Sequence, residues 1–172
     1  MNIHKMKLTP LLCVVLSVML FGCGEGADAK QSGQAIEDQL AEIRSAKLSR
    51  VTPEEVSEVF ALGSDSTDLQ RDILNKELVG SVVEWRLPIY EVELVEGRYK
   101  ITSQPIPIKS KEAVQLLRAA VFIVPSSVSD HVVMRKVKTN DMITVRGRVR
   151  EIVLRTVVVI EPALLVNQLT IN

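Results

Sequence analysis

The sequence predicts a mainly β protein with N-terminal helices, in which five strands form one sheet and a helix separates the third strand from the fourth. From Gly80 onward apolar residues recur at every second position, as in strands, whereas the preceding stretch repeats at helical spacing. Val, Ile and Leu supply most of the apolar content, and only six of the 172 residues are aromatic. A chain of this length with 47% hydrophobic residues can bury one modest core, so we expect one folded domain.

The first 22 residues have the layout of a secretory signal. A short basic start precedes the apolar run 11–21, which is too short to span a hydrocarbon core of about 30 Å as a helix. The motif LFGC, Leu20–Cys23, resembles the bacterial lipobox. That resemblance implies cleavage after Gly22 and a diacylglycerol joined by a thioether to Cys23. The alternatives are an ordinary signal peptide with an incidental cysteine, or an uncleaved anchor.

The cysteines support lipidation. Cys13 would leave with the signal, so Cys23 would be the sole cysteine of the mature chain and no internal disulfide could form. Buried acyl chains, at about 0.8 kcal/mol per methylene, would hold the chain on a bilayer. Gly24, not aspartate, follows the cysteine, which by the sorting rule of enteric lipoproteins resembles an outer-membrane address. We therefore expect a lipid-anchored protein of the bacterial cell envelope, on the periplasmic face of the outer membrane.

Residues 23–34 are small, polar and glycine-containing, which predicts a flexible tether between the membrane and the folded part. Residues 35–78 are then predicted to be helical. In the first helix Ile36, Leu40, Ile43 and Ala46 recur at steps of four, three and three, so they share one face.

Two further helices are expected within residues 35–78. The first begins at Thr52, an N-cap candidate followed by Pro53, and Glu55 completes a capping box. The second, within 64–78, places Leu69, Ile73 and Leu74 on one side. We expect these helices to cover one end of the sheet or to act as a spacer; a dedicated partner-binding helix is the alternative.

Residues 79–172 carry the strand pattern. The first strand changes phase beyond Pro88, which indicates a β-bulge that bends a long strand. Its apolar positions before the change are Val83, Trp85, Leu87 and Ile89, and those after it are Tyr90, Val92 and Leu94, so Trp85 and Tyr90 are assigned to the core.

The return strand begins near Tyr99, and the third strand lies within 119–125. Segment 104–118 is left unassigned, since Pro105 and Pro107 cannot donate to a central ladder. Ser127 with Asp130 predicts the start of a helix, and strands over 143–150 and 155–162 complete the set.

This order resembles the OB-fold, a five-stranded Greek-key barrel with a helix between strands 3 and 4. The stretch KTNDMITVRGRVREI is similar to the fourth strand of the tRNA-anti-like family, although Asn140 stands where that pattern has glycine. The resemblance covers residues 78–162. The stretch from Ser66 to Val92 also resembles parts of uncharacterised bacterial proteins, and that likeness implies no activity.

Arg146, Arg148 and Arg150 fall at every second residue, so they point outward if Ile143, Val145, Gly147 and Val149 point inward. Their spacing of about 6.6 Å suits a phosphate backbone. Two observations favour a solvated face. Few aromatic residues are available for base stacking, and the chain without Lys5 and Lys7 carries 19 basic against 21 acidic residues. We expect the arginines to pair with Glu91 and Glu93 on the first strand, and we do not expect nucleic acid as a partner. An acidic partner protein or phospholipid headgroups are the remaining alternatives for this row.

No catalytic or metal site is predicted. Ser127, Asp130 and His131 lie close in sequence, but a triad is defined by spatial arrangement, and no accompanying nucleophile motif is present. Cys23 and one histidine cannot form a four-ligand zinc site. We expect no enzyme, no cofactor and no metal.

These observations predict a membrane-anchored lipoprotein that carries a non-catalytic, OB-fold-like binding module for protein or envelope components. A structural or stress-related lipoprotein whose helices pack on a partner is a second hypothesis. A third is an oligonucleotide-binding protein that uses Arg146, Arg148 and Arg150. A small hydrolase is the least supported.

Overall fold

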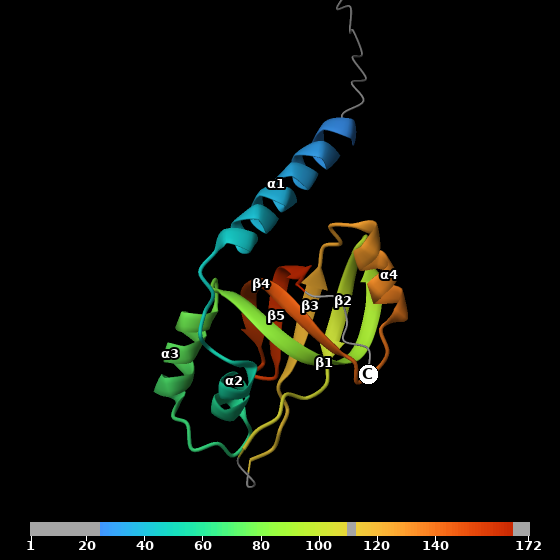
Figure 1. The fold of residues 1–172 in the computed structure, drawn as a ribbon. Helices are drawn as coiled ribbons and strands as arrows, with labels where there is room; N and C mark the ends of the chain where they lie inside the picture. Colours follow the sequence, from blue (N-terminus) through green and yellow to red (C-terminus); the bar gives the residue numbers. More distant parts are fainter. Residues whose placement is uncertain (1–24, 110–112, 167–172) are drawn as a thin grey trace, which may run out of the picture.

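The computed structural model describes residues 25–109 and 113–166, with side chains from residue 33 onward. Within these residues the chain is mainly β, preceded by helices (Figure 1). The elements are α1 (Glu25–Ser45), α2 (Pro53–Phe60), α3 (Asp68–Leu78), β1 (Val82–Val95), β2 (Arg98–Ser103), β3 (Arg118–Ile123), α4 (Val128–Lys136), β4 (Met142–Val153) and β5 (Val157–Leu165).

The five strands form one sheet that closes on itself in the order β1-β2-β3-β5-β4. All neighbouring pairs are antiparallel except β3 and β5, which are parallel. Closure depends on β1, because residues 82–88 pair with β4 and residues 89–95 pair with β2. The ladder to β2 shifts register between Ile89 and Glu91, so the predicted bulge in this strand is confirmed.

The core lies inside the ring, and the alternation of each strand fills it. Val83, Trp85, Leu87 and Ile89 of β1 are buried, as predicted. The Nε1–H of Trp85 donates to the backbone carbonyl of Val51 at 3.0 Å, which satisfies its one polar atom. Tyr90 is an exception, because it occupies the bulge and is 48% exposed. Its assignment to the core is therefore wrong, since the extra residue of a bulge leaves the inward alternation.

Helix α1 packs its C-terminal half on the outside of the ring. Leu40 and Ile43 are fully buried against Val82 and Leu164, and Ile36 and Ala46 pack at the edge of this cluster, which agrees with the predicted apolar face. The N-terminal half extends away from the sheet (Figure 1). The prediction of a flexible tether through residue 34 is wrong for residues 25–34, because these belong to the helix. Ala, Glu, Lys and Gln in this stretch are good helix formers, and that propensity outweighs the glycines.

Helix α2 begins as the sequence predicts, with a capping box at Thr52–Glu55. Helix α3 lies within the expected range 64–78 but begins only at Asp68, with a capping box at Thr67–Gln70 that was not predicted. Helix α2 buries Val56 in the core. On α3 only Leu74 of the predicted apolar side packs against the core, whereas Leu69 and Ile73 are exposed. Fewer apolar residues of α3 therefore pack against the core than its sequence pattern predicts.

Segment 104–118, left unassigned from sequence, contains no helix in its described residues; Val114 forms an isolated antiparallel bridge with Leu62, and Arg118 begins β3. Ile106 and Leu117 are buried there and are joined by a backbone hydrogen bond of 2.8 Å. Ser57, fully buried on α2, donates to the carbonyl of Ile106 at 2.9 Å.

Gly147 allows β4 and β5 to approach closely. A Cβ atom at this position would lie 2.5 Å from Ile160 Cγ2 and 2.7 Å from the Cβ of Ala163. We predict that Gly147→Ala lowers the free energy of unfolding by about 1–3 kcal/mol, because overpacking forces the strands apart. Urea denaturation measures this. Gly33→Ala in α1 is the matched control, since nothing lies within 4 Å of its Cβ position; equal stability of the two variants would contradict the prediction.

Candidate functional site: the arginine row and the groove beside β1

The arginine row, Arg146, Arg148 and Arg150, lies on the outer side of β4. Arg146 stands directly opposite Glu84 of β1. Its Nε and Nη2 donate to one oxygen of Glu84 at 2.8 and 2.6 Å, and its Nη1 donates to the carbonyl of Arg44 at 3.0 Å. The first arginine therefore bonds both to a cross-strand carboxylate and to the end of α1.

The other two arginines are also paired. The Nη2 atom of Arg148 lies 2.7 Å from Oε1 of Glu42 on α1, and its Nη1 donates to the carbonyl of Gly80 at 2.7 Å. Nη1 of Arg150 donates to Oε2 of Glu161 at 2.7 Å. This hydrogen bond and the negative charge of Glu161 raise the pKa of the Arg150 guanidinium above its ordinary value. All three guanidinium groups are thus engaged by carboxylates from three different elements.

The predicted pairing with Glu91 and Glu93 is wrong. Because β4 reaches only as far as Pro88 along β1, the residues beyond the bulge lie next to β2 instead. Glu93 faces Lys100 there, and the two side chains form an ion pair of 2.6 Å. The outer face carries alternating charges as expected, but with Glu84, Glu42 and Glu161 as the partners of the row.

The polar residues near α4 serve structural roles. Ser127 accepts the N–H of Asp130 at the start of the helix, in a capping box. His131 does not approach them as a triad would; its Nδ1 lies 2.8 Å from the hydroxyl of Tyr99. Among the described residues, no group of three or more His, Cys, Asp or Glu side chains is placed to hold a metal ion.

Asp130 has a lowered pKa. Burial by itself would raise the pKa of this carboxyl, but hydrogen bonds from Ser126 and Ser127 outweigh burial and hold it below the ordinary value. The ionised form is therefore the one that the folded state favours.

Cys23 and the predicted signal lie outside the described residues. Over residues 25–109 and 113–166, no helix is both long and apolar enough to cross a membrane.

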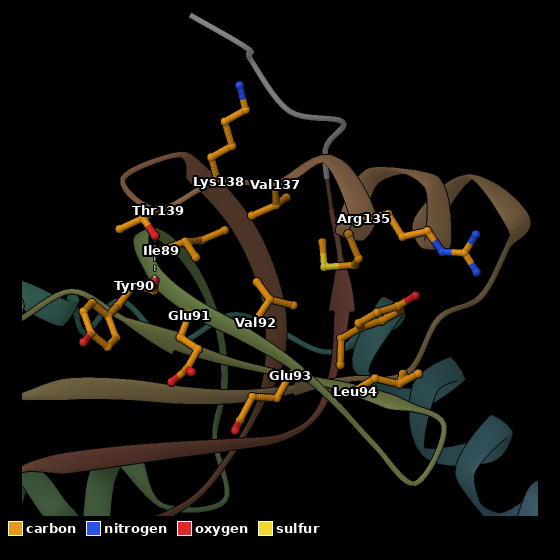
Figure 2. A pocket seen from close by; sticks show the side chains of 12 residues that line it. Ile89, Tyr90, Glu91, Val92, Glu93, Leu94, Arg135, Val137, Lys138 and Thr139 are labelled. Carbon is orange, nitrogen blue, oxygen red and sulfur yellow. Dashed lines mark hydrogen bonds between the residues drawn. The ribbon is translucent and has the colours of Figure 1, made fainter.

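A groove of about 640 Å³ lies between the second half of β1 and the α4–β4 connection (Figure 2). One wall is formed by β1 from Ile89 to Leu94. The opposite wall is formed by the end of α4 and the turn after it, from Met134 to Thr139. Arg135 and Lys138 stand at its rim and point toward solvent (Figure 2).

The groove was not predicted, although its cause is partly visible in the sequence. The first strand is 14 residues long, and β4 covers only its first half. The phase change near Pro88 was a signal that the strand changes partners at this point. Where β4 begins relative to β1 is decided by the register of the closed sheet, and no sequence pattern specifies that register.

No protein-family model matches this chain, and a search of curated proteins found no match. Among solved structures, the crystal structure of a "putative nucleic acid-binding lipoprotein" from Klebsiella pneumoniae is similar, with 13% sequence identity and a TM-score of 0.44. The similarity covers 76% of this chain and 98% of that one.

The cross-strand pair Arg146–Glu84 can be tested by a double-mutant cycle. We predict a coupling free energy of about 0.5–1 kcal/mol between Arg146→Ala and Glu84→Ala, since both side chains are less than one-third exposed. Urea denaturation of the four proteins measures it. A control cycle of Arg146→Ala with Glu91→Ala should give a coupling near zero, and a larger coupling in that cycle would restore the rejected pairing.

Asp130 predicts a pH dependence. Because its pKa is lower in the folded state, its contribution to stability is present above the ordinary carboxyl range and is lost as the pH falls through the folded-state pKa. We predict that Asp130→Asn has a lower urea midpoint than the wild type at pH 6, and that the difference narrows below about pH 4. A constant difference from pH 6 to pH 2.5 would argue against this role.

Proposed function

We propose that this protein is a lipid-anchored, non-enzymatic binding module of the bacterial cell envelope, which holds a protein segment in the groove beside β1. The observation that carries the proposal is the groove itself. It is the place where the closed sheet leaves a strand beside open space, while the arginine row is occupied by carboxylates of the same chain.

The architecture supports an OB-fold-like Greek-key barrel as the scaffold. The strand order β1-β2-β3-β5-β4, with α4 following β3 and preceding β4 in the chain, agrees with the arrangement to which the sequence is similar. A fold of this kind serves many ligands, so the function must be argued from the site and not from the scaffold.

The charges favour a protein ligand over an oligonucleotide. A phosphate backbone would have to displace Glu84, Glu42 and Glu161 from the arginine row. Trp85 and Tyr90 also offer no stacking platform on that row. Trp85 is buried, and Tyr90 lies with its ring 5.0 Å from the guanidinium of Arg118.

The envelope address rests on the N-terminal sequence. The motif LFGC at Leu20–Cys23 supports a diacylglycerol on Cys23, and Gly24 supports the periplasmic face of the outer membrane. The N-terminal half of helix α1, which extends away from the sheet, would then hold the binding module at a distance from the bilayer (Figure 1).

We predict that Cys23→Ala abolishes lipidation. In cells fed a palmitate analogue, the wild-type chain should be labelled and should sediment with the outer membrane. The Cys23→Ala chain should lose the label and leave the outer-membrane fraction, because no thiol remains at the cleavage site. Cys13→Ala is the matched control and should keep both properties. A labelled Cys23→Ala chain, or an unlabelled wild type, would refute the anchor.

A further inference from the structure

Within the part of the chain that the structure describes, the second half of β1 has a strand on one side only. Beyond Pro88 it pairs with β2, and among the described residues no other segment forms a backbone hydrogen bond with Glu91–Val95. The edge opposite β2 faces the groove described above, on which the proposed function also rests.

The hairpin between β1 and β2 fixes which main-chain groups face the groove. Val95 and Arg98 flank the two-residue turn Glu96–Gly97, in which both residues have positive φ. Residues that flank such a turn are a hydrogen-bonded pair, and hydrogen-bonded pairs alternate along the ladder. Glu93 and Glu91 therefore bond to β2, whereas the N–H and C=O groups of Val92 and Leu94 point into the groove.

A contact at the start of this edge agrees with that assignment. The hydroxyl of Thr139, on the far side of the groove, donates to the carbonyl of Tyr90 at 3.0 Å. The next outward-facing groups along the edge are those of Val92 and Leu94.

We propose that this edge binds an extended segment of a partner protein as an added β-strand, and that the segment alternates aliphatic and basic residues. Main-chain groups of an exposed edge are complementary to another extended chain, and this mode of recognition leaves side chains to set the specificity.

The aliphatic residues of the segment are specified by one side of β1. Val92 packs against the core cluster, whereas Leu94, on the same side of the strand, is 65% exposed. The apolar side of β1 therefore continues beyond the residues that the rest of the chain covers. Met134 and Val137 line the groove on the α4 side. Every second side chain of an added strand would lie between the apolar residues of β1 and those of the α4 side. An aliphatic side chain is complementary to these apolar surroundings.

The basic residues are specified by the other side. Glu91 and Glu93 project from the side of β1 opposite Val92 (Figure 2), where they would neighbour the remaining side chains of the added strand. Glu93 also forms the ion pair with Lys100 of β2, so a basic side chain of the segment would share Glu93 with Lys100. Opposite charges at such positions stabilise the pairing and like charges destabilise it. Two copies of this chain joined edge to edge would bring their glutamates together, so a basic partner is favoured over a second copy.

The test uses the full-length chain in detergent micelles and a blocked, labelled peptide of alternating lysine and valine, six residues long. We expect saturable binding by fluorescence anisotropy, with slowed amide exchange at Val92 and Leu94. An otherwise identical peptide of glutamate and valine should bind at least about tenfold more weakly, since its charges meet Glu91 and Glu93. Two further peptides carry N-methyl groups on alternate amides, one peptide in each phase. The peptide whose methyl groups face β1 should bind at least about tenfold more weakly, because it cannot complete the main-chain ladder, whereas the peptide whose methyl groups face away from β1 keeps those hydrogen bonds.

Leu94→Pro removes the outward N–H and leaves the bonds from Glu93 and Val95 to β2 in place, as proline is tolerated on a free edge. It should reduce affinity at least about tenfold. Leu94→Ala keeps the N–H and should lose less affinity than Leu94→Pro.

Equal binding of the lysine and glutamate peptides, full binding of both N-methylated peptides, or no binding at all would overturn strand addition. So would dimerisation of the free chain that competes with the peptide in light scattering. If Leu94→Pro does not fold, the N-methylated peptides still test whether binding requires main-chain hydrogen bonds to β1. If a chain labelled with the palmitate analogue at Cys23 binds no peptide, strand addition is refuted and the lipid anchor stands. If an unlabelled wild-type chain binds the peptide, the lipid anchor is refuted and strand addition stands.

Discussion

The structure depends on one strand that pairs with two different partners along its length. Closing a sheet into a ring requires strands that tilt and twist relative to one another, so that the ladders are staggered. The bulge between Ile89 and Glu91 bends β1 and increases its twist, so its first half completes the ladder with β4 and its second half begins the ladder with β2. The core side chains, the outer charges and the groove all take their positions from this bend.

The outer face shows the consequence for charge. Each arginine of the row is held by a carboxylate that the closed ring brings beside it: Glu84 from the neighbouring strand, Glu42 from α1 and Glu161 from β5. Partly exposed pairs of this kind contribute little individually. Together they join α1 to the sheet and neutralise a surface that would otherwise attract polyanions.

The groove is the other consequence. Because β4 ends its ladder at Pro88, the bend that closes the ring also leaves one edge of β1 without a paired strand among residues 25–109 and 113–166. Edges of this kind favour aggregation unless they are covered or charged. Here α4 stands opposite, and Glu91 and Glu93 disfavour pairing between copies. The acidic side chains that disfavour pairing between two copies favour pairing with a strand that carries positive charge.

Local chemistry determined much of this fold directly from the chain. The capping boxes at Thr52, Thr67 and Ser127 and the alternation of β1 and β4 are short-range patterns, and so is the apolar face of α1. Each depends on residues within one or two turns of each other. The exposed position of Tyr90, the true partners of the arginine row and the groove beside β1 depend on register between distant strands. The hydrophobic pattern and the turns favour a register for each neighbouring pair, but which distant strands become neighbours, and where each ladder ends, is decided only when all five strands close around one core.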